Sequence, residues 1–157
     1  MPVTDEQVVW LRAYLSGELE AAQKVSAHVA GPGAAAGLGA LVYAAFVVSA
    51  RRTFAPRWSR AEVTRYVTQV RRLLSDQPGA LDPAVAEQEL RSALGEKLTS
   101  HPGAKSRGRA QFILLNALVQ SLGLNDAELT DLLYQARGIA DSLLADSTGS
   151  GSKSGNS

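Results

Sequence analysis

Apolar residues recur along most of the chain at intervals of three and four, which is the spacing of an amphipathic helix. The pattern is clearest where Val63, Val67 and Val70 fall on one face. The segments with this spacing are 4–25, 60–75, 82–98, 107–122 and 125–145. Paired runs that alternate with a period of two, as half-buried strands do, do not occur. The sequence therefore predicts an all-α fold.

The stretch from Gly33 to Ala50 departs from this pattern because it carries no charge and is apolar on nearly all sides. Such a helix is either the buried centre of a helical protein or a membrane span. Its length is at the lower limit for a span, and much of it is Gly and Ala, which favour insertion weakly. The amphipathic helices around it also need a core. We expect a central helix over about 34–53 in a single-domain bundle of about six helices, and membrane association is not expected.

Side chains that cap helices precede several of these segments. An N-cap oxygen accepts a hydrogen bond from a backbone N–H of the first turn, and Glu or Gln three residues later completes a capping box. The predicted N-caps are Thr4, Ser59, Asp82 and Asn125. Gly17 is a potential break within the first helix. Similar residues follow Leu81 and Leu124, which indicates two similar hairpins in the C-terminal half, although chance also accounts for so few matches.

Residues 1–146 form the predicted helical domain, and residues 147–157 differ from it in composition. This last stretch is rich in Gly and Ser and has no apolar side chain. It buries too little surface to offset the entropy of ordering, so we predict a disordered tail.

Length and composition narrow the class of protein. The chain has 157 residues and a net charge of +1, which is typical of one domain without strong overall attraction to nucleic acid or membranes. It contains no cysteine, which excludes disulfides and thiolate chemistry. Asp5 and Glu6 stand where a signal peptide needs positive charge. We expect a cytoplasmic protein.

Residues that carry out catalysis are scarce. His28 and His101 are far apart and lie in no metal-ligand pattern, and no phosphate-binding or nucleophile motif occurs. Glu87 and Arg91 are spaced for a surface ion pair. We expect no enzymatic activity, no cofactor and no metal.

The most distinctive charge pattern lies between Arg51 and Arg72. This segment contains seven arginines and only one acidic residue, Glu62. Arginine holds phosphate through forked hydrogen bonds, so this segment is a candidate nucleic-acid surface. A basic loop at 101–109 extends it. The candidate binding residues are Arg51, Arg52, Arg57, Trp58, Arg60, Arg65, Gln69, Arg71, Arg72, Lys105, Arg107 and Arg109.

A plainer interpretation of the same arginines is that they form a solvated helix face or pair with acidic residues of neighbouring helices. The acidic residues of the later helices include Glu89, Glu96, Asp126 and Asp131. A dedicated DNA-binding domain is usually far more basic than this chain. This interpretation is preferred.

The sequence thus predicts a non-enzymatic domain that binds a protein partner or associates with itself. The alternative is a nucleic-acid-binding or regulatory protein that uses residues 51–72. A third option is a small-molecule pocket between the central helix and the helix over 107–122, where Tyr43 and Asn116 supply polar contacts.

Overall fold

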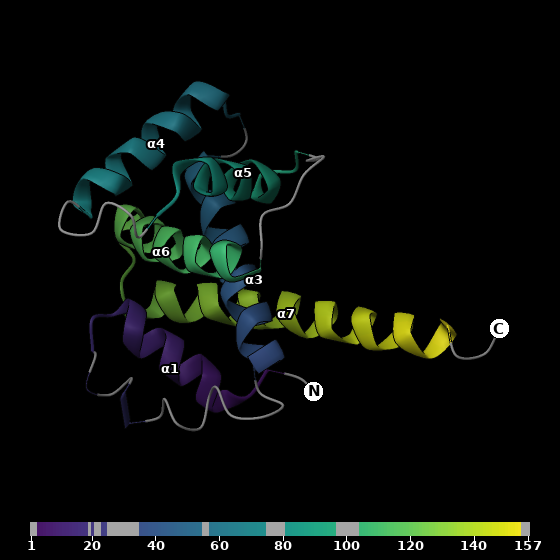
Figure 1. The fold of residues 1–157 in the computed structure, drawn as a ribbon. Helices are drawn as coiled ribbons and strands as arrows, with labels where there is room; N and C mark the ends of the chain where they lie inside the picture. Colours follow the sequence, from purple (N-terminus) through teal and green to yellow (C-terminus); the bar gives the residue numbers. More distant parts are fainter. Residues whose placement is uncertain are drawn as a thin grey trace. The chain divides into compact units, whose positions relative to one another are not determined.

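The computed structural model describes residues 3–18, 20, 23–24, 35–54, 57–74, 81–96 and 104–154. Within these ranges the chain is helical and contains no strand, which confirms the predicted all-α fold of about six helices (Figure 1). The helices are α1 (Asp5–Leu15), α3 (Ala35–Phe54), α4 (Arg60–Leu73), α5 (Pro83–Ala93), α6 (Ala104–Leu122) and α7 (Asp126–Ser154).

The chain divides into two compact units, and α3 contributes to both. One unit comprises Met1–Ala45 and Asn125–Ser157, and the other comprises Phe46–Leu124. The boundary falls inside α3, the helix that corresponds to the predicted central stretch. Its most buried side chains include Leu41 in the first unit and Phe46 in the second, so α3 is buried as its apolar sequence predicts.

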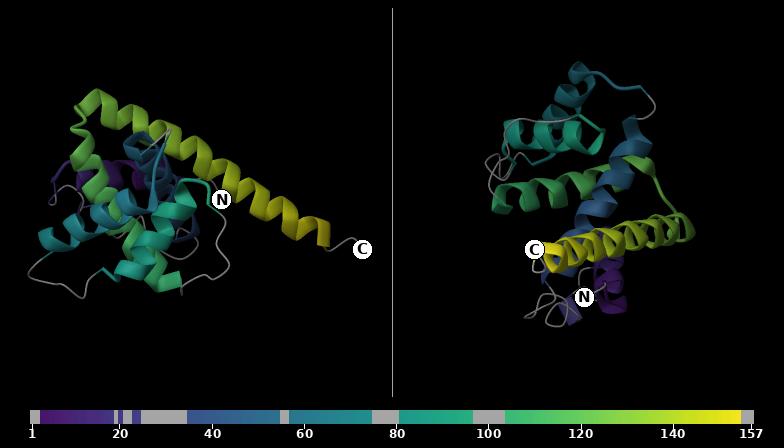
Figure 2. Two further views of the ribbon diagram at one scale, coloured as in Figure 1. Left: turned by 90° about the horizontal axis from the view of Figure 1, so that it is seen from above. Right: turned by 90° about the vertical axis from the view of Figure 1, so that its right-hand side faces the viewer.

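In the first unit, α1 packs along α7 (Figure 2). The buried side chains of this unit include Leu11 of α1 and Leu132 and Leu133 of α7. Polar contacts join the residue before the cap of α1 to the middle of α7. The backbone N–H of Val3 donates to Oδ1 of Asp141 at 2.8 Å, and Arg137 donates to the carbonyl of Val3 at 2.9 Å.

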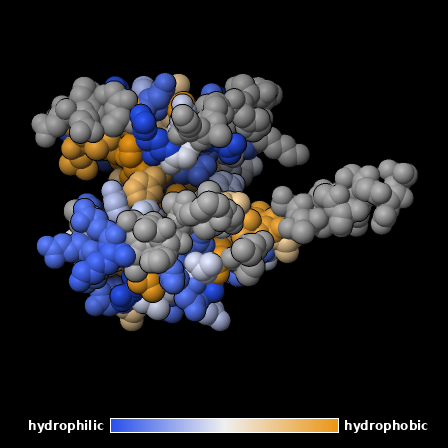
Figure 3. All heavy atoms as spheres, turned by 60° about the horizontal axis from the view of Figure 1, so that its bottom comes forward, coloured by the Kyte–Doolittle hydropathy of each residue, from blue (hydrophilic) through white to orange (hydrophobic). Residues whose placement is uncertain are grey.

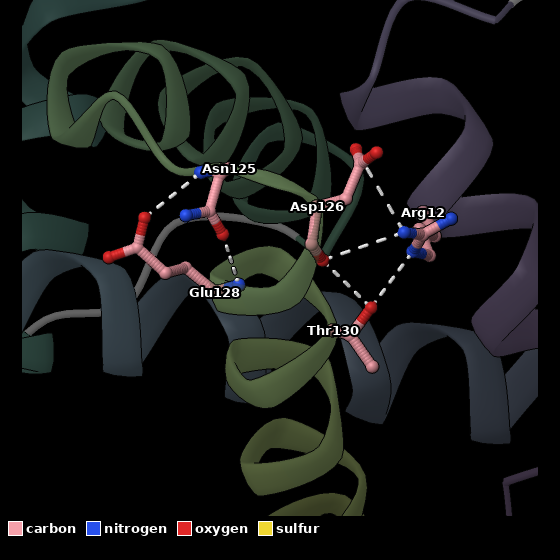
Figure 4. Close-up of polar contacts among 5 residues, drawn as sticks. All are labelled: Arg12, Asn125, Asp126, Glu128 and Thr130. Atoms are coloured by element: carbon pink, nitrogen blue, oxygen red, sulfur yellow. Dashed lines mark hydrogen bonds and ion pairs between the residues drawn. The ribbon is translucent and has the colours of Figure 1, made fainter.

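The start of α7 shows how the sequence fixes a helix end (Figure 4). The side chain of Asn125 accepts from the backbone N–H of Glu128 at 2.8 Å, and the carboxylate of Glu128 accepts from the N–H of Asn125 at 3.1 Å. Beside this cap, Nε of Arg12 donates to the hydroxyl of Thr130 at 3.1 Å and so ties α1 to α7. The predicted caps Thr4, Ser59 and Asp82 also accept from their first turns.

In the second unit, α5 packs against both α4 and α6. The three valines of α4, Val63, Val67 and Val70, are buried as their spacing predicts. Tyr66 adds a contact to α3, because its ring meets that of Phe54 edge-on at 5.4 Å. Burial raises the pKa of the Tyr66 phenol, and its hydrogen bond with Ser121 opposes that shift.

Three helix boundaries differ from those expected from the sequence. Helix α1 ends at Leu15, well before 25, because Gly17 adopts a left-handed φ of 83°. Helix α5 ends at Ala93 instead of about 98, because Gly95 has a φ of 103°. Both positions use the freedom of glycine to stop a helix. Helix α6 begins at Ala104, so part of the predicted basic loop is helical.

Helix α7 also continues further than predicted. The sequence predicts a helix end near Ala145 and a disordered tail over 147–157, whereas the backbone of α7 is helical through Ser154. The predicted helix end near Ala145 is therefore wrong. Backbone hydrogen bonds between residues four apart are local, so a helix can continue beyond its last apolar side chain without a packing partner.

The predicted pair of similar hairpins is matched only at the helix starts. Asp82 and Asn125 both cap helices. Gly95, however, ends α5, whereas the equivalent Gly138 lies inside α7. The predicted loop at 31–33 and both histidines, His28 and His101, lie outside the described residues.

Candidate interaction surfaces

The predicted basic surface is distributed over three helices of the second unit and the connection between two of them. Arg51 and Arg52 lie on α3, Arg57 and Trp58 precede α4, and Arg107 and Arg109 lie on α6. Arg60, Arg65, Gln69, Arg71 and Arg72 lie on α4. Lys105 is on the first turn of α6, and the structure describes its backbone only.

Arg60, one of these predicted residues, forms an ion-pair cluster with Glu96 and Arg91. The carboxylate of Glu96 accepts from Arg60 at 3.0 Å and from Arg91 at 2.5 and 2.6 Å. The hydrogen bond from Arg91 is the main reason that the pKa of Glu96 falls from 4.5 to about 2. The partner of Arg91 is thus Glu96, where the sequence predicts Glu87, and the Glu87 carboxylate accepts from the hydroxyl of Thr64.

Two more of the predicted arginines, Arg107 and Arg51, make hydrogen bonds within the second unit. Glu89 is only 3% exposed, and its carboxylate accepts from Arg107 at 2.6 Å and from Gln111 at 3.4 Å. Arg51 donates to the carbonyl of Ala93 at 3.1 Å, near the end of α5. Arg60 and Arg107 therefore pair with acidic residues, as the plainer interpretation of the charge pattern expects, whereas Arg51 contacts a backbone carbonyl.

The exposed part of the basic surface includes a narrow stripe on α4, and Arg52 on α3 is exposed as well. Arg65, Gln69 and Arg72 are exposed, as their spacing predicts. Arg57 and Arg109 are exposed elsewhere in the unit, and Trp58 is half-buried. Arg71 is half-buried, and its Nε has no hydrogen-bond partner among the described residues. The stripe is positively charged but small.

Exposed apolar side chains form a second surface, on α7. Ile139 and Leu143 are each 41% exposed and lie one turn apart, whereas Tyr134, which is 78% exposed, lies on the opposite side of the helix. Figure 3 shows hydrophobic atoms beside the grey C-terminal part of this helix. The three- and four-residue spacing of the apolar residues over 125–145 predicts that Leu143 lies on the same inward face as Leu132 and Ala140, and that prediction is wrong. Leu143 lies within the arc formed by Leu132, Ala136 and Ala140, but it follows Ala140, the last buried residue described on this helix, so it is exposed because the packing ends before it.

A shallow open groove of about 550 Å³ runs beside these side chains. Its described lining consists of Gln135, Gly138, Ile139, Ser142 and Leu143, which recur three and four apart on one side of α7. Nothing described lies within 4 Å of where a Cβ of Gly138 would be, so the groove is open at this glycine. The sequence carried a signal for this site in the small residues Gly138 and Ser142 between exposed apolar ones.

Other apolar side chains on the surface are more isolated. Leu73, at the end of α4, is 80% exposed although its spacing predicts an inward position. Val9 is exposed on α1. Trp10 and Tyr14 of the same helix are half-buried, with ring centroids 5.6 Å apart. None of these side chains lines the groove on α7.

The described residues contain no group of three His, Asp or Glu side chains arranged to hold a metal. The Nδ2 group of Asn116 donates to the carbonyl of Phe112 at 2.9 Å, so its own helix satisfies that donor. Tyr43 is half-buried on α3. No described helix is long and apolar enough to cross a membrane. Comparison of the chain with protein-family models, curated proteins and solved structures finds no match.

Proposed function

We propose that this chain is a non-enzymatic interaction domain that binds another protein through the outward face of α7. The observation that carries the proposal is the pair Ile139 and Leu143, one turn apart at a groove and each 41% exposed. Aliphatic side chains at this spacing are those with which helices dock in protein complexes. Full burial of one such side chain contributes about 1.5–3 kcal/mol of favourable free energy. Because Ile139 and Leu143 are partly exposed, a partner that covers them gains part of this free energy.

The chain's lack of cysteine allows a direct test of the proposed face. Ser142→Cys places a single thiol in the groove, to which a photoactivatable cross-linker is attached. Ser106→Cys, at an exposed position on α6, is the matched control. In the cells that make the protein, the Ser142 probe is expected to cross-link a protein that the Ser106 probe does not, and Leu143→Asp is expected to remove that product. Equal labelling from both positions contradicts the proposal.

A second candidate function is nucleic-acid binding by α4, favoured by the exposed stripe Arg65, Gln69 and Arg72. Its support is weaker because Arg60 and Arg107 pair with Glu96 and Glu89. Binding through so few arginines would be weak and steeply salt-dependent. Retardation of DNA or RNA at low salt that Arg65→Glu and Arg72→Glu remove would support this function, and the absence of any retardation would end it.

A further inference from the structure

We infer that the partner that docks on the α7 groove is a basic amphipathic helix. This inference rests on the proposed function and adds the chemistry of the partner. Its basis is that the groove lies within a stripe of acidic side chains, with the apolar pair Ile139 and Leu143 at its edge. The ligand that matches both features carries apolar residues along one face and Lys or Arg beside them.

The acidic side chains lie on the same side of α7 as the groove. Glu128, Asp131 and Asp146 are all exposed. Together with Gln135 and Ser142 they recur at spacings of three, four or seven, which places them along one helix face. Acidic groups therefore stand toward both ends of the groove, two before it in sequence and one after it.

No positive charge compensates this stripe among the described side chains of α7. The one basic side chain there is Arg137, and it is turned toward α1. Arg137 donates to Asp5 at 2.5 Å and to the carbonyl of Val3 at 2.9 Å. The described outward face thus keeps a one-signed negative potential, which favours a positively charged partner and disfavours a negative one.

The same charges argue against a second copy of the chain on this face. A two-fold dimer brings one patch onto itself, so Asp131 and Asp146 of one copy would approach the same acidic stripe of the other. Like charges that face each other without counter-ions are unfavourable. A different protein with the opposite charge avoids this repulsion.

The shape of the groove favours a helix as the occupant. Its described lining follows a single helix over two turns, and Gly138 leaves space at its centre. Small residues on a helix allow a second helix to approach closely. A Cβ added at Gly138 has no described atom of the chain within 4 Å, so a larger residue there is expected to enter the groove without disturbing the fold.

The test uses two synthetic helical peptides that share a leucine face, one flanked by lysines and one by glutamates. Binding to the purified full-length protein is followed by fluorescence anisotropy at low and high salt. The lysine peptide is expected to bind at least about tenfold more tightly than the glutamate peptide at low salt, and to lose most of that advantage at high salt.

Two variants separate the charge from the groove. Asp131→Asn combined with Asp146→Asn is expected to weaken binding of the lysine peptide but not of the glutamate peptide. It is also expected to reduce the salt dependence of binding by the lysine peptide. Gly138→Gln is expected to abolish binding while the melting temperature stays the same or rises, because Gln is a better helix former than Gly. Gly138→Gln therefore tests the groove even if replacement of an apolar residue, as in Leu143→Asp, unfolds the protein.

The possible results overturn different statements. Equal binding of both peptides contradicts the inference that the partner is basic, but it is consistent with docking of a helix on α7. Failure of both peptides to bind overturns the inference, as does a dimer of the pure protein that Leu143→Asp dissociates. The proposed function is tested separately, by the Ser142 probe in cells, and it fails if that probe captures nothing beyond its control.

Discussion

The side-chain oxygen Oε1 of Gln7 lies 3.0 Å from where a Cβ of Gly37 would stand. This close approach joins α1 and α3 within the first unit. Gln7 is fully buried, and its Oε1 accepts a hydrogen bond from the backbone N–H of Thr4 at 3.1 Å. A Cβ added at Gly37 therefore requires a shift of a few tenths of an ångström in the Gln7 side chain, which also closes the cap of α1.

Gly37→Ala is therefore expected to be less stable than Gly39→Ala, although both replace a glycine in the same helix. A Cβ at Gly39 meets nothing within 4 Å, so Ala there is expected to stabilise by up to about 1 kcal/mol through helix propensity. At Gly37 this gain is opposed by overpacking of about 1–3 kcal/mol. Urea unfolding of both variants measures the difference. Equal midpoints would show that the Gln7 contact does not constrain α3.

The buried carboxylate of Glu89 gives a prediction for the second unit. Glu89→Ala removes the partner of Arg107 and Gln111, and we expect a loss of about 2–4 kcal/mol. Glu62→Gln, at an exposed position on α4, is the control and is expected to change stability by less than about 0.5 kcal/mol. Thermal unfolding compares the two. A Glu89→Ala protein as stable as its control would contradict a structural role for this ion pair.

Glu96 predicts a pH dependence of stability. Its pKa is lowered to about 2 in the folded protein from 4.5, mainly by the hydrogen bond from Arg91. A carboxyl group with a lowered pKa stabilises the fold above the unfolded value, and this contribution is lost as pH falls through the folded value. Between pH 4.5 and 2, the wild-type protein should lose more stability than Glu96→Gln. Parallel pH profiles of the melting temperature would disprove this assignment.

The C-terminal turns of α7 are expected to contribute little to stability. Residues 147–154 are helical in backbone but carry no apolar side chain, and a helix without packing frays in water. Hydrogen exchange should be fast there and slow around Leu132 and Leu133, which are buried. Removal of 147–157 should leave the melting temperature unchanged. Slow exchange over 147–154 would instead indicate that this segment packs against a partner.

The sequence predicts the helices well where local rules determine them. The spacing of Val63, Val67 and Val70 and the caps Ser59 and Asn125 specify faces and starts that the structure confirms. Helix ends are less predictable. Glycines such as Gly17 and Gly95 stop a helix only when they adopt a left-handed conformation, which depends on the residues packed around them.

The candidate surfaces are predicted less well, because they depend on contacts between distant residues. A run of arginines does not reveal that Arg60 meets Glu96 or that Arg107 meets Glu89. Likewise, Leu143 has the same helical spacing as buried residues of α7, and only the arrangement of neighbouring helices leaves it exposed. Charge is readable from sequence, whereas its neutralisation is a property of the fold.

The measurement that tests the central claim most directly is the size of the protein in extracts of the cells that make it. The chain alone has a mass of 16.5 kDa. We predict that the wild type elutes in a larger complex, that Leu143→Asp returns it to its own mass, and that Leu73→Asp, which changes an exposed leucine on α4, leaves the complex intact. A wild-type protein that elutes alone, or a complex unaffected by Leu143→Asp, would contradict docking on α7.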